Sequence, residues 1–218
     1  MKNSIINVLE ILSRKYFTDD KTTLNRMRVS KEKSPFKILV SCLLSLRARD
    51  ENTEKVSANL FKFANTPQEI LKLPTIKLEK LIFSSGHYHK KARTLKEVSK
   101  VLIENFNSKV PDNKEKLLSI KGIGPKTANI VLNFAFDKKV IPVDTHCHRI
   151  PNRLRWIKTK NPEQTEIELM KIIPKKYWRR FNAIFVQFGR DICLPISPLC
   201  SKCSVEKFCK KINVKKFR

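Results

Sequence analysis

SIKGIGPKTANIVL, residues 119–132, contains two of the four glycines in this 218-residue chain. Helical patterns of apolar residues flank the two glycines: one pattern ends near Ile120 and the other begins at Pro125. Proline suits the first position of a helix because its missing N–H would have no intrahelical acceptor there. The second pattern carries one apolar stripe at helical spacing, formed by Ala128, Val131, Leu132 and Ala135. The stretch therefore predicts two helices joined by a tight turn, with the second helix packed on a core.

The turn between these helices has the composition of an anion site. Gly122 and Gly124 permit positive φ angles and leave no Cβ in the way of an approaching backbone, while Ile123 can point inward. The free N–H groups of the turn and of the new helix then lie at the positive end of a helix dipole, which suits a phosphodiester. These three residues are candidate phosphate contacts, although GIG alone is equally compatible with an ordinary helical hairpin.

The charge of the chain favours a polyanionic partner. Its 46 Lys and Arg residues against 20 Asp and Glu give a formal net charge of +26, with an isoelectric point near 10.1. Hydrophobic residues make up 41% of the chain, which excludes a disordered polycation and allows a core. Nucleic acid is the first candidate partner and an acidic membrane surface the second. A lysine-rich composition with solvated faces would account for part of the excess without any partner.

Helical periodicity dominates the rest of the sequence. An N-terminal stripe of Ile5, Val8, Leu9 and Leu12 is typical, and no segment alternates convincingly with period two. The stretch PTIKLEKLIFSSG predicts a short helix that Gly86 stops in a left-handed conformation. We expect an all-α protein without a membrane span or a signal-peptide core, and therefore an intracellular one, in the cytoplasm or nucleoid if prokaryotic.

The cysteine-rich tail predicts a metal site. Cys193, Cys200, Cys203 and Cys209 have the spacing C-x6-C-x2-C-x5-C. A disulfide set is not expected in a reducing compartment. Four thiolates at this spacing suit structural zinc or a [4Fe–4S] cluster, and the spacing alone does not decide between them. Cys42 lies outside the set on an apolar helix face, where we expect a buried thiol. The pairs His87/His89 and His146/His148 do not share a helix face and are not read as metal ligands.

Two longer stretches, LLSIKGIGPKTANIVLNFAF (117–136) and VDTHCHRIPNRL (143–154), resemble the helix–hairpin–helix DNA glycosylases, specifically the endonuclease III family. Ile120 and Lys121 stand where that family commonly has Leu-Pro, and the resemblance runs from about residue 35 to 209. It implies two all-α domains with a DNA-binding cleft between them. The first is a six-helix domain over residues 28–138; residues 1–27 and 139–218 form the second, with the cluster loop at 193–209. The resemblance also favours [4Fe–4S] as the group that the four cysteines hold.

The same resemblance matches Lys126 to the family's nucleophile and Asp144 to its catalytic carboxylate. An amine attacks a sugar C1′ only when neutral, and the positive end of a helix dipole disfavours the ammonium form of Lys126. At the predicted start of a helix, Asp144 would be held by backbone donors and could stabilise positive charge on the sugar or accept a proton. Each residue alone has a simpler interpretation, as a solvated lysine and as an ordinary N-cap.

The resemblance implies a bifunctional DNA N-glycosylase and abasic-site lyase that removes oxidised or damaged pyrimidines, such as thymine glycol, from double-stranded DNA. Lysine at position 126 separates the subfamilies, because the adenine-specific relatives have no lysine there and the thymine-mismatch relatives typically have tyrosine. Lys126 therefore implies the bifunctional reaction, in which a Schiff base forms on this lysine and β-elimination follows. No diffusible cofactor is expected. Nothing in the sequence indicates an obligate oligomer, and we expect a monomer. One alternative is a mismatch glycosylase that removes T or U opposite G; another is a non-catalytic helix–hairpin–helix DNA-binding protein.

Three positions depart from the family pattern. Arg47 lies in a loop where glutamine is usual, and His87 stands in place of an apolar wedge that fills the gap left by a flipped base. Arg47 could bond a guanine edge or clamp a phosphate, and His87 could stack on a base. Pro151 lies inside the helix expected after Asp144. An interior proline costs about 3 kcal/mol, so we expect a bend or an early end to that helix.

Overall fold

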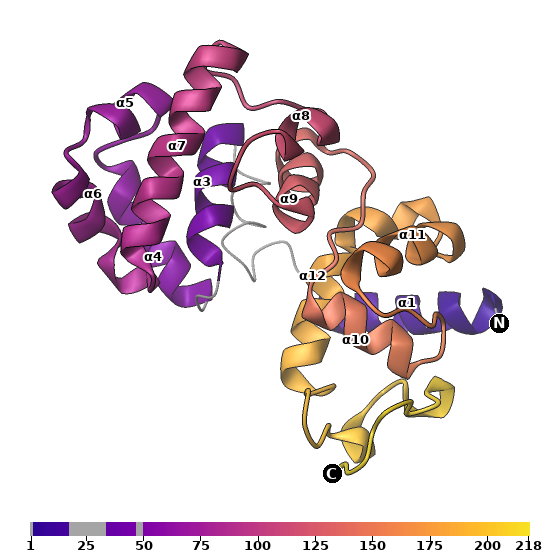
Figure 1. Cartoon of the computed structure of the whole chain (residues 1–218). Coiled ribbons are helices and arrows are strands. Elements are labelled where there is room, and N and C mark those ends of the chain that lie inside the picture. The colour runs from indigo at the N-terminus through magenta and orange to yellow at the C-terminus, as the bar shows by residue number, and fades with distance from the viewer. Residues whose placement is uncertain (1, 18–33, 47–49) are drawn as a thin grey trace. The chain divides into compact units, whose positions relative to one another are not determined.

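Every regular element of the described chain is helical (Figure 1). The computed structural model describes residues 2–17, 34–46 and 50–218, and over these residues the all-α prediction is confirmed. The chain forms two compact units: unit 1 comprises Met1–Thr18 and Lys139–Arg218, and unit 2 comprises Asp19–Lys138. The domain boundary expected between residues 27 and 28 lies outside the described residues.

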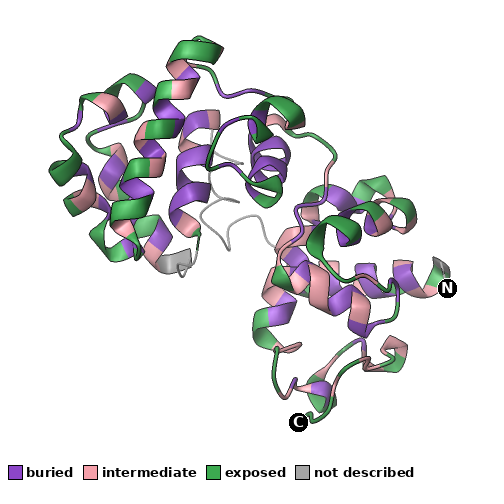
Figure 2. Ribbon diagram, in the orientation of Figure 1, coloured by how far each residue is buried: buried purple, intermediate pink, exposed green. Residues whose placement is uncertain are grey.

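Unit 2 is built around two helices, α3 (Pro35–Ser45) and α7 (Tyr88–Phe106). Eight of the nine residues of α3 from Phe36 to Leu44 are buried, all except Lys37, because the sequence of this helix is apolar on nearly every side. Figure 2 shows this burial along α3 and along the α9 helix that it contacts. The described part of unit 2 has seven α-helices, where six were expected. The others are α4 (Asp50–Phe61), α5 (Pro67–Lys72), α6 (Thr75–Ile82), α8 (Lys114–Leu118) and α9 (Pro125–Phe136).

Unit 1 brings the two ends of the chain together on one aromatic core. The helix α12 (Lys175–Asp191) contacts α1 (Lys2–Tyr16) and α10 (Thr145–Arg153), and α11 (Pro162–Ile172) packs on α10. The rings of Phe181 and Phe185 stack on α12, 4.1 Å apart. The expected apolar stripe of α1 faces this core and is buried: Ile5, Val8, Leu9 and Leu12.

Pro151 does not stop the helix in which it lies. We expected a bend or an early end, but α10 continues without interruption through Pro151 to Arg153, so the expectation of an early end is wrong. Pro151 is the seventh of nine helical residues, so its missing N–H removes one bond near the helix end, and its ring is buried. The Asn152 side chain donates to His148 O at 2.8 Å and strengthens the same turn.

In the described part of the chain, no helix combines the length and the apolar character needed to cross a bilayer.

Candidate active site

The glycine turn between α8 and α9 forms as the sequence predicts, but only one glycine uses its freedom. Gly122 has φ +99°, and a Cβ there would lie 2.8 Å from Cγ2 of Thr94 on α7. Gly124 is extended, with φ −91° and ψ 174°, so it needs no positive φ. Ile123 points inward and is 5% exposed, as expected. The turn therefore lies tightly on α7 at Gly122 and is open at Gly124, where a Cβ would meet no atom within 4 Å.

The start of α9 is open to an anionic ligand. Gly124 is its N-cap and offers no side-chain oxygen, and Pro125 at the first position has no N–H. The first intrahelical bond runs from Ala128 N to Gly124 O at 2.9 Å. Because no side chain caps this end, the N–H groups of the first turn can bind a phosphate together with the helix dipole.

Lys126 lies on this first turn with an exposed side chain. Beneath it, the Cys42 thiol of α3 is 1% exposed, as expected of a buried small side chain. Burial raises the pKa of Cys42 to about 11, while the positive charge of Lys126 and a hydrogen bond with Thr127 limit the rise. Cys42 is therefore an uncharged thiol under the amine and does not compete with it as a nucleophile near neutral pH.

Asp144 caps the start of α10 in unit 1. Its Oδ1 accepts hydrogen bonds from His146 N at 2.9 Å and from Cys147 N at 2.8 Å, which is the predicted N-cap arrangement. The residue is half-buried. Within the described residues, the second oxygen, Oδ2, accepts no hydrogen bond. One oxygen thus fixes the carboxylate and the other remains available to a substrate.

Arg149 connects the Asp144 helix to the end of α12. Its NH2 group lies 3.1 Å from His146 Nδ1 and donates to Gly189 O at 3.3 Å and to Cys193 O at 2.7 Å. Gly189 is needed for this approach, because a Cβ there would lie 2.1 Å from His146 Nδ1. His146 is thus held between an arginine and a glycine, two residues after the Asp144 carboxylate.

His148 and His89 each contact a polar side chain of this chain. His148 Nδ1 lies 2.7 Å from Thr165 Oγ1, and His89 Nδ1 lies 2.9 Å from Glu79 Oε1.

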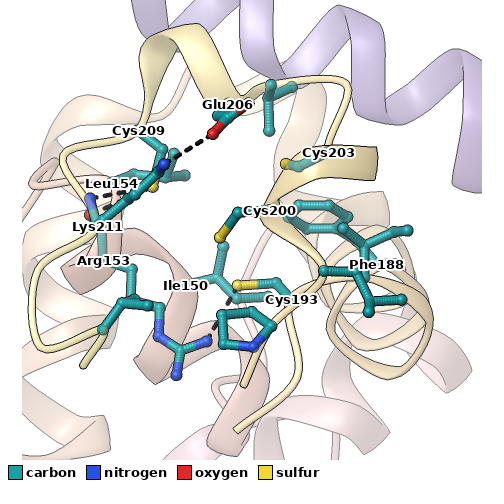
Figure 3. A pocket seen from close by; sticks show the side chains of 15 residues that line it. Ile150, Arg153, Leu154, Phe188, Cys193, Cys200, Cys203, Glu206, Cys209 and Lys211 are labelled. Carbon is teal, nitrogen blue, oxygen red and sulfur yellow. Dashed lines mark hydrogen bonds and ion pairs between the residues drawn. The ribbon is translucent and has the colours of Figure 1, made fainter. Parts of the chain in front are cut away.

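The four tail cysteines line one cavity of unit 1, although they span residues 193–209. Figure 3 shows their thiols around the cavity, together with Ile150 and Leu154 near α10 and Phe188 of α12. All four are free thiols. Within the described residues, no three His, Cys, Asp or Glu side chains converge so as to hold a single metal ion. Burial raises the pKa of Cys203 to about 11, and the three neighbouring thiols add to the rise.

Hydrogen bonds from α10 hold the first part of this loop. Arg153 is 7% exposed; its guanidinium donates to Cys193 Sγ at 3.3 Å and to the carbonyls of Leu194 and Pro195 at 2.6 Å each. At the other end of the loop, Lys211 N donates to Cys209 Sγ at 3.3 Å.

The sequence reading missed Arg149 and Arg153. Their i, i+4 spacing, which places them on one face of the Asp144 helix, was the available signal.

Arg47 and His87 are the two residues expected to contact DNA near the lesion, and the structure describes only His87. Arg47 lies outside the described residues. His87 is exposed at the start of α7, and its backbone is left-handed, with φ 48° and ψ 32°.

The chain matches the model of the HhH-GPD superfamily of base excision DNA repair proteins over residues 40–175. It is 48% identical to endonuclease III of Thermotoga maritima over 182 residues, which cover 84% of this chain and 85% of that protein. The chain belongs to the endonuclease III family. Family membership makes it a DNA repair enzyme of the DNA glycosylase and abasic-site lyase class.

The fold of this chain is similar to solved structures of endonuclease III and of a thymine-DNA glycosylase. A trapped covalent intermediate of endonuclease III with DNA has a TM-score of 0.85 and 32% identity, covering 97% of this chain and 96% of that one. A thermostable thymine-DNA glycosylase has a TM-score of 0.84 and 26% identity, with 96% of each chain covered. The fold is therefore shared by family members whose names refer to different reactions.

The two glycines of the turn differ in a way that mutation can measure. Gly122→Ala should lower the free energy of unfolding by about 1–3 kcal/mol, because it forces a Cβ into the left-handed region and onto Thr94. Gly124→Ala should change it by less than about 0.5 kcal/mol, since the backbone is extended and the space is open. Urea unfolding of both variants checks this.

Thr94→Ser in the Gly122→Ala background is the control, because it removes the methyl group that the new Cβ meets and should restore part of the loss. Equal effects of the two alanine variants would contradict this account of the turn.

Proposed function

We propose that this enzyme excises damaged pyrimidines from duplex DNA with Lys126 as the nucleophile and Asp144 as the catalytic carboxylate. The observation that carries the proposal is the position of Lys126. It is exposed on the first turn of α9, directly after an uncapped turn that suits a phosphodiester. A backbone phosphate held by the residues 122–124 would bring a sugar within reach of the Lys126 amine.

In the proposed reaction, the neutral Lys126 amine forms a bond to C1′ of the damaged nucleotide, and the glycosidic bond breaks with its electron pair leaving on the base. Opening of the sugar ring gives a Schiff base between Lys126 and C1′. Loss of a proton from C2′ then expels the 3′ phosphate in a β-elimination, and water releases the enzyme. Only lysine among the ordinary side chains at this position supports both steps, since an imine needs a primary amine.

Asp144 has a supporting role that its geometry favours. Its Oδ1 is fixed by two backbone donors, so the carboxylate keeps one orientation without spending Oδ2. A carboxylate held in this way stabilises positive charge that develops on the sugar as the base leaves, and it can take the proton that the lysine loses.

The proposed substrate is an oxidised or damaged pyrimidine such as thymine glycol. The endonuclease III relatives support this class, and so does lysine at position 126, where thymine-mismatch relatives typically have tyrosine. The runner-up is removal of T or U opposite G. It is favoured by Arg47, which could bond a guanine edge, and by the similarity to a thymine-DNA glycosylase.

We also propose that Cys193, Cys200, Cys203 and Cys209 hold a [4Fe–4S] cluster. Their thiols line one cavity of unit 1, so the loop brings all four together, and the endonuclease III relatives support a [4Fe–4S] cluster over zinc at this spacing. When bound, the cluster cross-links the residues 193–209 at four positions. The chain's own contribution is the set of donors from Arg153 and the Lys211 amide, which orient the loop and face its sulfur atoms.

Borohydride trapping on an abasic duplex tests the catalytic pair. Wild-type protein should give a covalent adduct, and Lys126→Ala should give none, because no amine remains to form the imine. Asp144→Asn should fold normally, since asparagine caps a helix as well as aspartate does, but its rate of base excision should fall by about 10²-fold or more. Rates are measured by gel under single-turnover conditions.

Lys100→Ala is the matched control, because Lys100 is an exposed lysine of unit 2 that pairs only weakly with Glu104, at 3.8 Å. It should trap as the wild type does. An undiminished adduct with Lys126→Ala overturns the assignment of the nucleophile, and duplex binding by wild-type protein with no turnover favours a non-catalytic DNA-binding protein.

A substrate panel separates the two candidate activities. Wild-type protein should excise thymine glycol from duplex DNA at least tenfold faster than T from a G·T pair or U from a G·U pair. The opposite order would establish the mismatch activity and reject the proposed substrate class. Arg47→Gln, which restores the usual family residue, should reduce any G·T or G·U activity.

Metal analysis tests the cysteine loop. Protein purified without oxygen should be yellow-brown and contain about four iron atoms per chain. Cys203→Ser should lower the iron content, whereas Cys42→Ala should leave it unchanged, because Cys42 belongs to the other unit. A colourless, iron-free protein that contains one zinc ion would contradict the cluster.

A further inference from the structure

The turn between α6 and α7 has an unusual backbone. α6 ends at Ile82, and a single 3-10 turn, Phe83–Ser85, follows it. Gly86 then has φ +68° and ψ 150°, and His87 has φ +48° and ψ 32°, so two successive residues have positive φ and His87 is left-handed. A left-handed conformation is uncommon for a residue other than glycine, and it persists only where the surroundings impose it. His87 is exposed at the tip of this turn, directly before the first residue of α7.

Side chains of α4 and α7 bind carbonyl groups at the end of α6 and in the turn that follows it. Asn59 of α4 donates from Nδ2 to Leu81 O at 3.1 Å. Asn52, also on α4, donates from Nδ2 to Ser84 O. Lys91 donates from Nζ to Ser85 O at 2.7 Å. Two side chains, Asn52 and Lys91, thus hold the turn immediately before His87, and Asn59 holds the last turn of α6 that leads into it.

Lys91 makes more of these contacts than either asparagine. Its Nζ also donates to Leu44 O in the last turn of α3, at 2.7 Å. Its backbone N–H donates to His87 O at 3.0 Å, which is the first hydrogen bond of α7. One residue therefore bonds the carbonyl of His87, the carbonyl two residues before it, and the end of α3.

The ammonium group of Lys91 is costly to place there. Lys91 is 7% exposed, and burial lowers its pKa. Within the described residues, no carboxylate pairs with it, so its partners are the carbonyl dipoles at the ends of α3 and of the 3-10 turn. Cations are favoured at such helix ends, and a lysine is almost never buried unless polar partners hold its ammonium group.

We propose that Lys91 is a positioning residue for base excision. It fixes the turn that presents His87 against the end of α3, so that His87 stands ready to fill the gap that a flipped base leaves in the duplex. This inference rests on the proposed function, and it goes beyond it by assigning the placement of His87 to a buried lysine. Lys91 itself does not touch the substrate.

The role predicts a selective defect. Filling the gap matters when a base must leave a duplex, whereas an abasic site in single-stranded DNA has no opposite strand and no stack to replace. Lys91→Met keeps the aliphatic bulk of the side chain. It removes the ammonium group and with it the hydrogen bonds to Leu44 O and Ser85 O. It should slow excision of thymine glycol from duplex DNA about tenfold or more, while borohydride trapping of a single-stranded abasic oligonucleotide should stay within about twofold of wild type.

Lys96 of the same helix supplies a matched control. Its Nζ donates to Leu71 O at 3.0 Å and to Leu73 O at 2.6 Å, at the end of α5 and away from the turn. Lys96→Met removes the same kind of bond and should lower the melting temperature, but it should leave the ratio of duplex excision to single-stranded trapping unchanged. Lys91→Arg, which keeps a cationic donor, should restore most of that ratio.

A double-mutant cycle with His87→Ala tests whether Lys91 acts through His87. If it does, Lys91→Met should add less than about twofold to the defect of His87→Ala. Should Lys91→Met fail to fold, Asn52→Ala provides the second variant, because Asn52 holds the same turn at Ser84 and should show the same selective defect.

The outcomes separate this inference from the proposed function. Wild-type protein that forms no adduct with any abasic DNA rejects the proposed function. Active wild-type protein combined with a Lys91→Met variant that loses both activities equally, or whose defect adds fully to that of His87→Ala, rejects the positioning role alone.

Discussion

The uncapped start of α9 is the constraint on which the rest of unit 2 depends. A helix that begins without a side-chain cap leaves backbone N–H groups with no protein acceptor, so water or a ligand can bind them. Here Gly122 lies directly on Thr94 of α7, and Ile123 is buried beneath the turn. α3 packs along α9 and is buried over most of its length. The core thus holds the start of a helix that no side chain caps, and Lys126 lies on its first turn.

Side-chain hydrogen bonds hold the cysteine loop of unit 1, whereas packing holds the start of α9 in unit 2. The loop over residues 193–209 has little regular structure beyond two short 3-10 turns. Arg153 binds its first residues and Arg149 binds the carbonyl of Cys193, so the helix that Asp144 caps also organises the cysteines. This link connects the proposed catalytic carboxylate and the cysteine loop through one helix of nine residues. It also explains why two arginines are tolerated among largely buried groups, because each satisfies several acceptors at once.

Several residues other than glycine have a positive φ angle. With four glycines in the chain, several helix ends use other residues in the left-handed conformation, including Asn107 after α7 and Asp137 after α9. Asparagine and aspartate accept this conformation more readily than most residues do. His87 also adopts this conformation, and Asn52 and Lys91 bind the two residues of its turn that precede Gly86. The positive φ angle of the exposed His87 and the hydrogen bonds from Asn52 and Lys91 thus occur in the same turn.

The sequence by itself determined the helical class, the glycine turn, the cap at Asp144 and the four cysteines, because each depends on short-range spacing and on the properties of single residue types. Thus Pro125, Gly122 and Asp144 occupy the positions that local rules predict. Tertiary structure alone decided that Gly124 needs no positive φ, that Pro151 lies within an unbroken helix, and that Lys91, Arg149 and Arg153 serve as internal donors. These features depend on contacts between residues far apart in the chain. The spacing of residues along the sequence cannot predict such contacts, for example the hydrogen bond from Lys91 Nζ to Leu44 O.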